Sequence, residues 1–146
     1  KRLVAQLFET ARVLELPIFE LAGWRASAGE RETIRRAAQE FWPGMPLADF
    51  RRHDRVFHTL IAGSCGNALL VEMYAKVLDA LFRSAEFESL LYDEANRQQV
   101  DELIARSVAD HHAIAKAFAD GPAVDVVAAS EQHLANVEHR IVEELV

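Results

Sequence analysis

The sequence predicts an all-α fold, and the spacing of its apolar residues is the first reason. Apolar side chains recur every three or four positions along the whole chain, and the alternation typical of strands is almost absent. With 146 residues, of which 51% are hydrophobic, the chain is long enough for one core but short for two domains. We therefore expect a single domain over residues 1–146.

Short breaks in the apolar pattern divide the chain into helices. Ser27 opens a capping box, which predicts a helix directly after it, and the two prolines of Trp42–Pro46 end that helix. Gly66–Asn67 and Gly121–Pro122 combine a helix-ending glycine with a residue suited to a helix start. We expect six helices, at about residues 2–26, 28–42, 47–64, 67–87, 94–119 and 122–145.

Composition limits the functions that this segment can have. Its 23 acidic and 16 basic residues give a net charge of −7, the wrong sign for a surface that binds nucleic acid. Cys65 is the only cysteine, so no disulfide can form within the chain. The sequence has neither a signal peptide nor an apolar run long enough to span a membrane, and we expect a cytoplasmic protein.

The third expected helix carries polar residues on its apolar face. At about 100° per residue, the apolar stripe of this helix runs through Phe50, Phe57 and Ile61. Asp54 falls in the middle of that stripe, and His58 follows one turn later. Both side chains are expected to point into the core, where a carboxylate without a partner is costly.

Two further histidines are expected to face inward. His111 lies near the centre of the apolar stripe of the fifth helix, and His133 lies at the edge of the stripe of the sixth. The other three histidines, His53, His112 and His139, fall away from these stripes, so we expect them on the solvated surface.

These residue types suggest a metal site. An aspartate and a histidine four positions apart have Cβ atoms about 5–6 Å apart on one helix face and can bind one ion together. Two inward histidines from neighbouring helices would complete a set of three imidazoles and one carboxylate, which suits Zn²⁺, Ni²⁺, Fe²⁺ or Mn²⁺. A dry core in which Asp54 bonds to His58 or to an arginine fits the same residues. Spacing alone leaves both interpretations open.

A longer motif around Asp54 resembles a known family. Residues 54–70 read DRVFHTLIAGSCGNALL, which is similar to the pattern D-x-x-F-H-x-x-[L/I]-x-x-x-[S/A]-G-N-x-x-L of the FCD domain. That domain is the ligand-binding C-terminal half of FadR-type regulators in the GntR family of transcription factors. Residues 110–114 read DHHAI and resemble the family's E-H-x-x-I, and His133 follows His111 by 22 residues, as the family's last metal-ligating histidine does. The resemblance covers essentially the whole chain.

The resemblance implies an antiparallel bundle of six or seven helices around a central ligand cavity. It implies that a divalent metal, zinc ahead of nickel, iron or manganese, binds at the cavity floor through Asp54, His58, His111 and His133. A small organic acid would contact this ion as the effector. The family also carries a DNA-binding winged helix-turn-helix before this domain, which residues 1–146 do not include.

The first helix departs from the family pattern. The family's E-x-R-x-x-x-E directs its arginine toward the effector, whereas residues 9–15 read ETARVLE and place Ala11 at that position. Arg12 is turned by about 100° around the helix. We therefore do not expect Arg12 to bind the effector, and whether the effector is an anion is less firmly implied than the metal.

The third helix also predicts a homodimer. Val56 and Leu60 form a second apolar set away from the core stripe, and such a face on a bundle helix usually packs against a partner.

Three functions are compatible with these residues, and an effector-sensing and dimerisation domain of a transcription regulator is the first. A metal-dependent hydrolase using the three histidines and Asp54 is the alternative, although no residue is convincingly placed as a general base and the motif H-E-x-x-H is absent. A helical interaction module without a ligand would leave Asp54 unexplained. We therefore predict a sensor and not an enzyme.

Overall fold

The computed structural model describes residues 1–146 and contains seven α-helices and no strands. The helices are α1 (Arg2–Arg25), α2 (Ala28–Ala38), α3 (Leu47–Gly63), α4 (Ala68–Phe82), α5 (Ala85–Tyr92), α6 (Arg97–Asp120) and α7 (Ala123–His139). A 3₁₀ turn, Glu94–Asn96, precedes α6, and a π-helical turn, Arg140–Glu144, extends α7. The prediction of an all-α fold is confirmed.

Two of the predicted helix starts have the expected caps. The Ser27 hydroxyl accepts a hydrogen bond from the Glu30 N–H at 3.1 Å, and the Ser27 N–H donates to the Glu30 carboxylate at 3.0 Å. This reciprocal pair is the capping box at the start of α2. At the start of α4, the Asn67 side chain accepts from the first two backbone N–H groups of the helix, each at 3.1 Å. Gly66 precedes it with a φ of +73°, a conformation that favours glycine.

The expected single helix over residues 67–87 is wrong, because the chain forms two helices there. α4 ends at Phe82, and α5 begins at Ala85 in a new direction. Ser84 starts α5, since its hydroxyl accepts a hydrogen bond from the Phe87 N–H at 3.2 Å. The helix expected over residues 28–42 also ends early, at Ala38.

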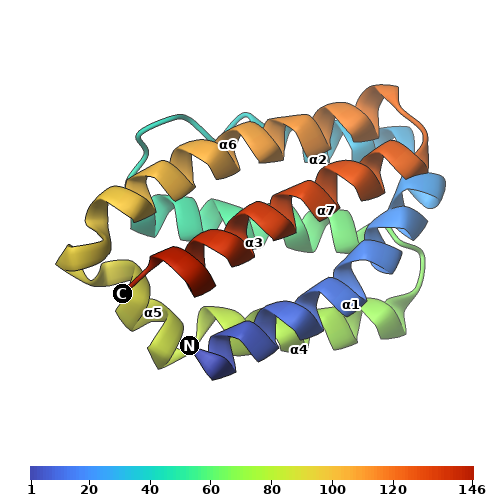
Figure 1. Cartoon of the computed structure of the whole chain (residues 1–146). Coiled ribbons are helices and arrows are strands. Elements are labelled where there is room, and N and C mark those ends of the chain that lie inside the picture. The colour runs from blue at the N-terminus through green and yellow to red at the C-terminus, as the bar shows by residue number, and fades with distance from the viewer.

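The helices form an antiparallel bundle (Figure 1). α1, α3 and α6 run in one direction along the bundle, and α2, α4 and α7 run in the other. α7 lies between α1 and α6 and contacts both, while α2 packs against α3 and α6. α3 therefore lies across the interior of the bundle from α7, and side chains of α1, α3, α6 and α7 can meet at its centre.

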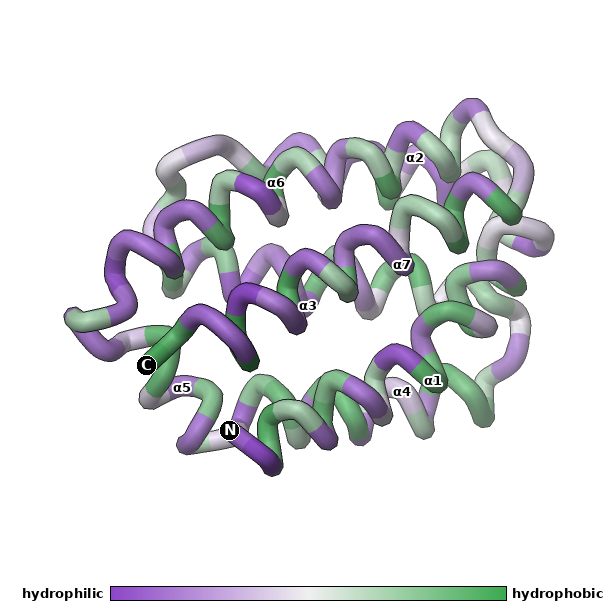
Figure 2. The backbone as a smooth tube through the Cα atoms, viewed as in Figure 1, coloured by the Kyte–Doolittle hydropathy of each residue, from purple (hydrophilic) through white to green (hydrophobic).

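Apolar residues recur along every helix instead of gathering in one segment, as Figure 2 shows. Their buried faces join in one core that includes Phe19, Phe57, Ile61, Ile114 and Phe118. None of the helices combines the length and apolar character needed to span a membrane.

One carboxylate and three imidazoles are buried within this apolar core. Glu15 of α1, His58 of α3, His111 of α6 and His133 of α7 each expose 6% or less of their surface. Buried groups of this kind need partners, because removing a charge or a polar group from water is costly. Their partners lie at one place, the centre of the bundle.

Candidate metal centre

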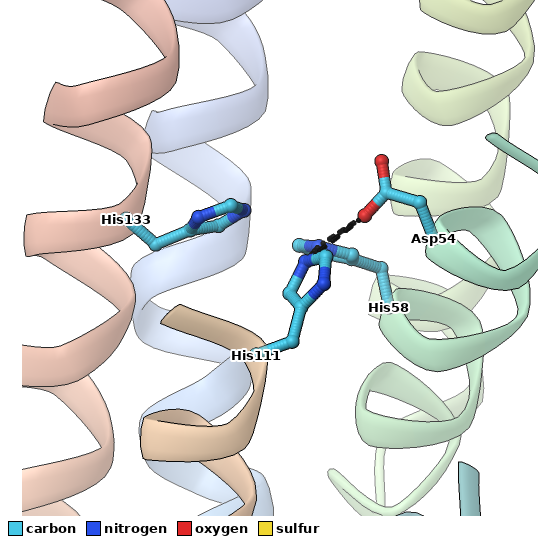
Figure 3. A group of neighbouring side chains, drawn as sticks. All are labelled: Asp54, His58, His111 and His133. Carbon is cyan, nitrogen blue, oxygen red and sulfur yellow. Dashed lines mark hydrogen bonds and ion pairs between the residues drawn. The ribbon is translucent and has the colours of Figure 1, made fainter. Parts of the chain in front are cut away.

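Four side chains from three helices converge at the centre of the bundle (Figure 3). α3 provides Asp54 and His58 on one face, α6 provides His111, and α7 provides His133. One nitrogen or carboxylate oxygen of each residue lies within 4.8 Å of those of the other three. The sequence predicted that these four residues face inward, and the structure brings all of them together.

The contacts within the cluster fit a bound cation better than a set of hydrogen bonds. The Oδ1 atom of Asp54 lies 3.1 Å from Nε2 of His58 and 3.1 Å from Nε2 of His111. Those two nitrogens lie 3.3 Å from each other. Oδ1 is buried, yet no hydrogen bond of ordinary geometry reaches it. A divalent ion among these atoms would satisfy the oxygen and use the nitrogen lone pairs, and the donor set suits zinc.

Two further carboxylates contact the outer ring nitrogens of two of the imidazoles. Nδ1 of His58 lies 2.8 Å from Glu15, which also accepts a hydrogen bond from the Tyr74 hydroxyl. Nδ1 of His133 lies 3.1 Å from Asp110. A metal-ligating histidine usually donates its other ring N–H to a carboxylate in this way. Both rings are therefore oriented with Nε2 toward the centre.

Glu15 is the functional residue that the sequence analysis missed. It appeared there only as the last residue of the segment ETARVLE and was given no role, yet the buried face of α1 runs through Ala11, Glu15 and Ile18. Glu15 lies four positions after Ala11 and three before Ile18, so helical periodicity could have found it.

Two carboxylates, Asp54 within the cluster and Glu15 beside it, control the charge of the imidazoles. Burial opposes ionisation of Asp54, but the imidazoles of His58 and His111 outweigh it and lower its pKa. Burial would also lower the pKa of His58, but the charges of Glu15 and Asp54 raise it to about 10. Burial lowers the pKa of His111 to about 4, so this imidazole is neutral at neutral pH. Both carboxylates favour a positive charge at the centre, whether a proton or a metal ion supplies it.

A cavity of about 70 Å³ lies beside the cluster. Asp54, His58 and His133 line it, whereas His111 does not. Its other walls are mainly apolar side chains, among them Phe8, Phe50, Phe82, Phe87, Leu103 and Leu134. A small molecule in this cavity would therefore reach three of the four cluster residues and otherwise contact mainly apolar surface, together with the polar side chains of Glu15, Arg51 and Ser107.

The remaining histidines lie outside the cluster. His112 is exposed, with Nε2 3.0 Å from the Ala38 carbonyl oxygen, and His139 is exposed beside Glu144. His53 is half-buried and packs against the Phe41 ring, so its predicted place on the solvated surface is only partly correct.

Arg12 lies outside the cavity, as expected. Its guanidinium pairs with Glu138 of α7 at 3.4 Å.

An all-α bundle that encloses a cavity beside four converging donor side chains is a domain built to hold a small ligand. The family model of the FCD domain matches residues 6–136, and the chain belongs to this family of regulatory effector-binding domains. No curated protein and no solved structure matches the chain.

Proposed function

We propose that the chain is the effector-sensing and dimerisation domain of a FadR-type transcription regulator of the GntR family. In this proposal Asp54, His58, His111 and His133 bind one divalent metal ion, with zinc the first candidate. A small organic acid binds in the adjoining cavity and contacts the ion. DNA is bound by a winged helix-turn-helix domain outside residues 1–146.

The observation that carries the proposal is the position of the four donors directly beside the cavity. A structural zinc site uses all of its coordination positions for the protein, whereas a site that faces a cavity can keep a position open for a ligand. Three of the donors line the cavity. The effector could thus bind to the ion directly, and the bundle could respond to it through α3 and α7.

The alternative of a hydrolase has less support from the same geometry. Hydrolysis at a metal needs a general base beside the bound water. Glu15 is the carboxylate nearest to the cluster after Asp54, but His58 and Tyr74 already occupy it. We therefore favour sensing over catalysis.

Two measurements test the proposal. Elemental analysis of protein purified without a polyhistidine tag should find about one divalent ion per chain. The metal-loaded protein should then gain thermal stability with one or more acids in a panel of small organic acids, since ligands stabilise the state that they bind. A metal-free protein that takes up no zinc, nickel, iron or manganese would contradict the proposal.

A further inference from the structure

Arg51 puts a permanent positive charge on the cavity wall, and it lies outside the four-residue cluster. It is the only lysine or arginine among the residues that line the cavity. Arg51 lies three positions before Asp54 and seven before His58, so the three residues share one face of α3. At 1.5 Å per residue, its Cα lies about 4.5 Å before that of Asp54 along the helix axis.

Arg51 has no carboxylate partner, unlike its neighbours on the same helix. Arg52 pairs with Asp49, and Arg55 pairs with Asp79. The Nε atom of Arg51 is shielded from solvent and has no hydrogen-bond partner. A buried N–H of a charged group that is left unpaired is costly, so an acceptor is expected at this position.

The structure holds the Arg51 guanidinium in place for such an acceptor. Its Nη2 donates to the Phe82 carbonyl oxygen at 3.1 Å, at the C-terminal end of α4. Its Cζ lies 5.5 Å from the centre of the Phe82 ring and 5.7 Å from that of Phe87. These contacts fix the guanidinium at the end of the bundle where α5 lies (Figure 1), and Nε remains free.

The cavity wall itself indicates a singly charged ligand. Arg51 is the one lysine or arginine that lines the mainly apolar cavity, and no carboxylate of the chain pairs with it. One carboxylate would neutralise it through a charge-assisted hydrogen bond.

The cavity also limits the size of the ligand. At roughly 10–15 Å³ for each water-sized group, a cavity of about 70 Å³ holds about five to seven such groups. Its apolar walls suit a short hydrocarbon chain. We propose that the ligand is a short-chain monocarboxylate and that Arg51 binds its carboxylate; this inference rests on the proposed function, because it concerns the same cavity. Arg51 of α3 would thus bind the carboxylate that the family pattern assigns to an arginine of the first helix, at the position that Ala11 occupies here.

The test compares butyrate with its uncharged isostere butyramide on zinc-loaded protein, by isothermal titration calorimetry. The wild-type protein should bind butyrate at least about tenfold more tightly than butyramide, as expected for a charge-assisted hydrogen bond. Arg51→Met should weaken butyrate binding by about tenfold or more, weaken butyramide binding by clearly less and retain zinc. Arg55→Met is the matched control, since Arg55 also lies over the Phe82 ring but does not line the cavity. It should behave like the wild type.

The outcomes separate this inference from the proposed function. If Arg51→Met weakens both probes equally, or neither, Arg51 is a structural residue and the inference is wrong, while the metal site stands. Wild-type protein that binds zinc but neither probe also overturns the inference. Failure to bind zinc contradicts the proposed function itself. If the methionine variant does not fold, as judged by circular dichroism, Arg51→Gln carries the same comparison.

Discussion

Glu15 of α1 and His58 of α3 are 43 residues apart in sequence, yet a carboxylate oxygen of the first lies 2.8 Å from Nδ1 of the second. Both side chains are buried in an otherwise apolar core. The pair joins α1 to the four-residue cluster and sets which nitrogen of His58 faces its centre. In the proposed metal site, α1 would thus orient a ligand and would not supply one.

Glu15→Gln should therefore weaken metal binding without removing a ligand. The amide can still accept the His58 N–H, but it lacks the charge that makes the imidazole a better donor, and losses of this kind are about 10-fold to 100-fold in affinity. A competition titration of zinc against a chromophoric chelator measures the change. Glu9→Gln, at an exposed position of the same helix, should bind zinc like the wild type. Equal affinity in the two variants would contradict the orienting role.

His111 and His112 should differ sharply although they are adjacent. His111 is fully buried in the cluster, and His112 is exposed. His111→Ala should lose the ion, whereas His112→Ala should keep it in elemental analysis. A ligand at about 100 times its Kd contributes about 2.7 kcal/mol, so a chelator should lower the melting temperature of wild type and His112→Ala by about 5–10 °C. The chelator should leave His111→Ala unchanged. Metal retained in His111→Ala and lost in His112→Ala would refute the site.

Metal binding should release about one proton near a pH of about 7.5. The pKa of His58 in the metal-free protein is raised to about 10, so the ring is protonated there, and an ion must displace the proton on Nε2. Calorimetric titrations of zinc in buffers with different ionisation enthalpies measure the number released. Binding enthalpies that do not depend on the buffer would show that no such proton leaves.

The same pKa shift predicts how the metal-free protein responds to pH. The folded-state pKa of His58 lies above its ordinary value of 6.5, so its charge stabilises the fold below a pH of about 6.5. This contribution is lost as the pH rises toward about 10. His111, with a pKa lowered to about 4, is neutral in both states over that window and does not contribute. The melting temperature of chelator-treated protein should therefore fall between these pH values, and less so in His58→Gln.

Val56 should lie in a homodimer interface. Its side chain is 49% exposed on α3, whereas Leu60, predicted to accompany it, packs partly against the core. Sedimentation at micromolar concentration should show a dimer for the wild type and a monomer for Val56→Arg. Val13→Arg, at an exposed apolar position of α1, should remain a dimer. A monomeric wild type would contradict the prediction.

The sequence predicted most of the helices and the inward position of the four cluster residues, because the periodicity of a helix determines which of its residues are buried. Asp54 lies on the same stripe as Phe57 and Ile61, so the sequence of this one helix already shows a polar residue in an apolar position. The break at Ser84 was missed because the spacing of apolar residues continues across it. Only the serine cap marks the start of α5, and no proline or glycine lies beside it.

Residues whose role depends on contact with another helix could not be assigned that role from the sequence. The roles of Glu15 and Arg51 become visible only when α1 and α4 are placed beside α3, since one pairs with His58 and the other with the Phe82 carbonyl. Asp110 was noticed only as part of a motif, and its contact with His133 requires the packing of α6 against α7. Contacts of this kind are set by tertiary structure.

The position of His111 behind the cavity has a consequence for the order in which ligands bind and leave. Asp54, His58 and His133 line the cavity, while His111 is fully enclosed by the core. If the cluster holds an ion and the cavity holds an acid, as proposed, the ion would exchange with solvent through the cavity and the acid would stand in its path. The acid could come and go while the ion stayed in place, whereas the ion could depart only after the acid. Such a domain would follow the concentration of the acid on a fast timescale and that of the metal on a slow one.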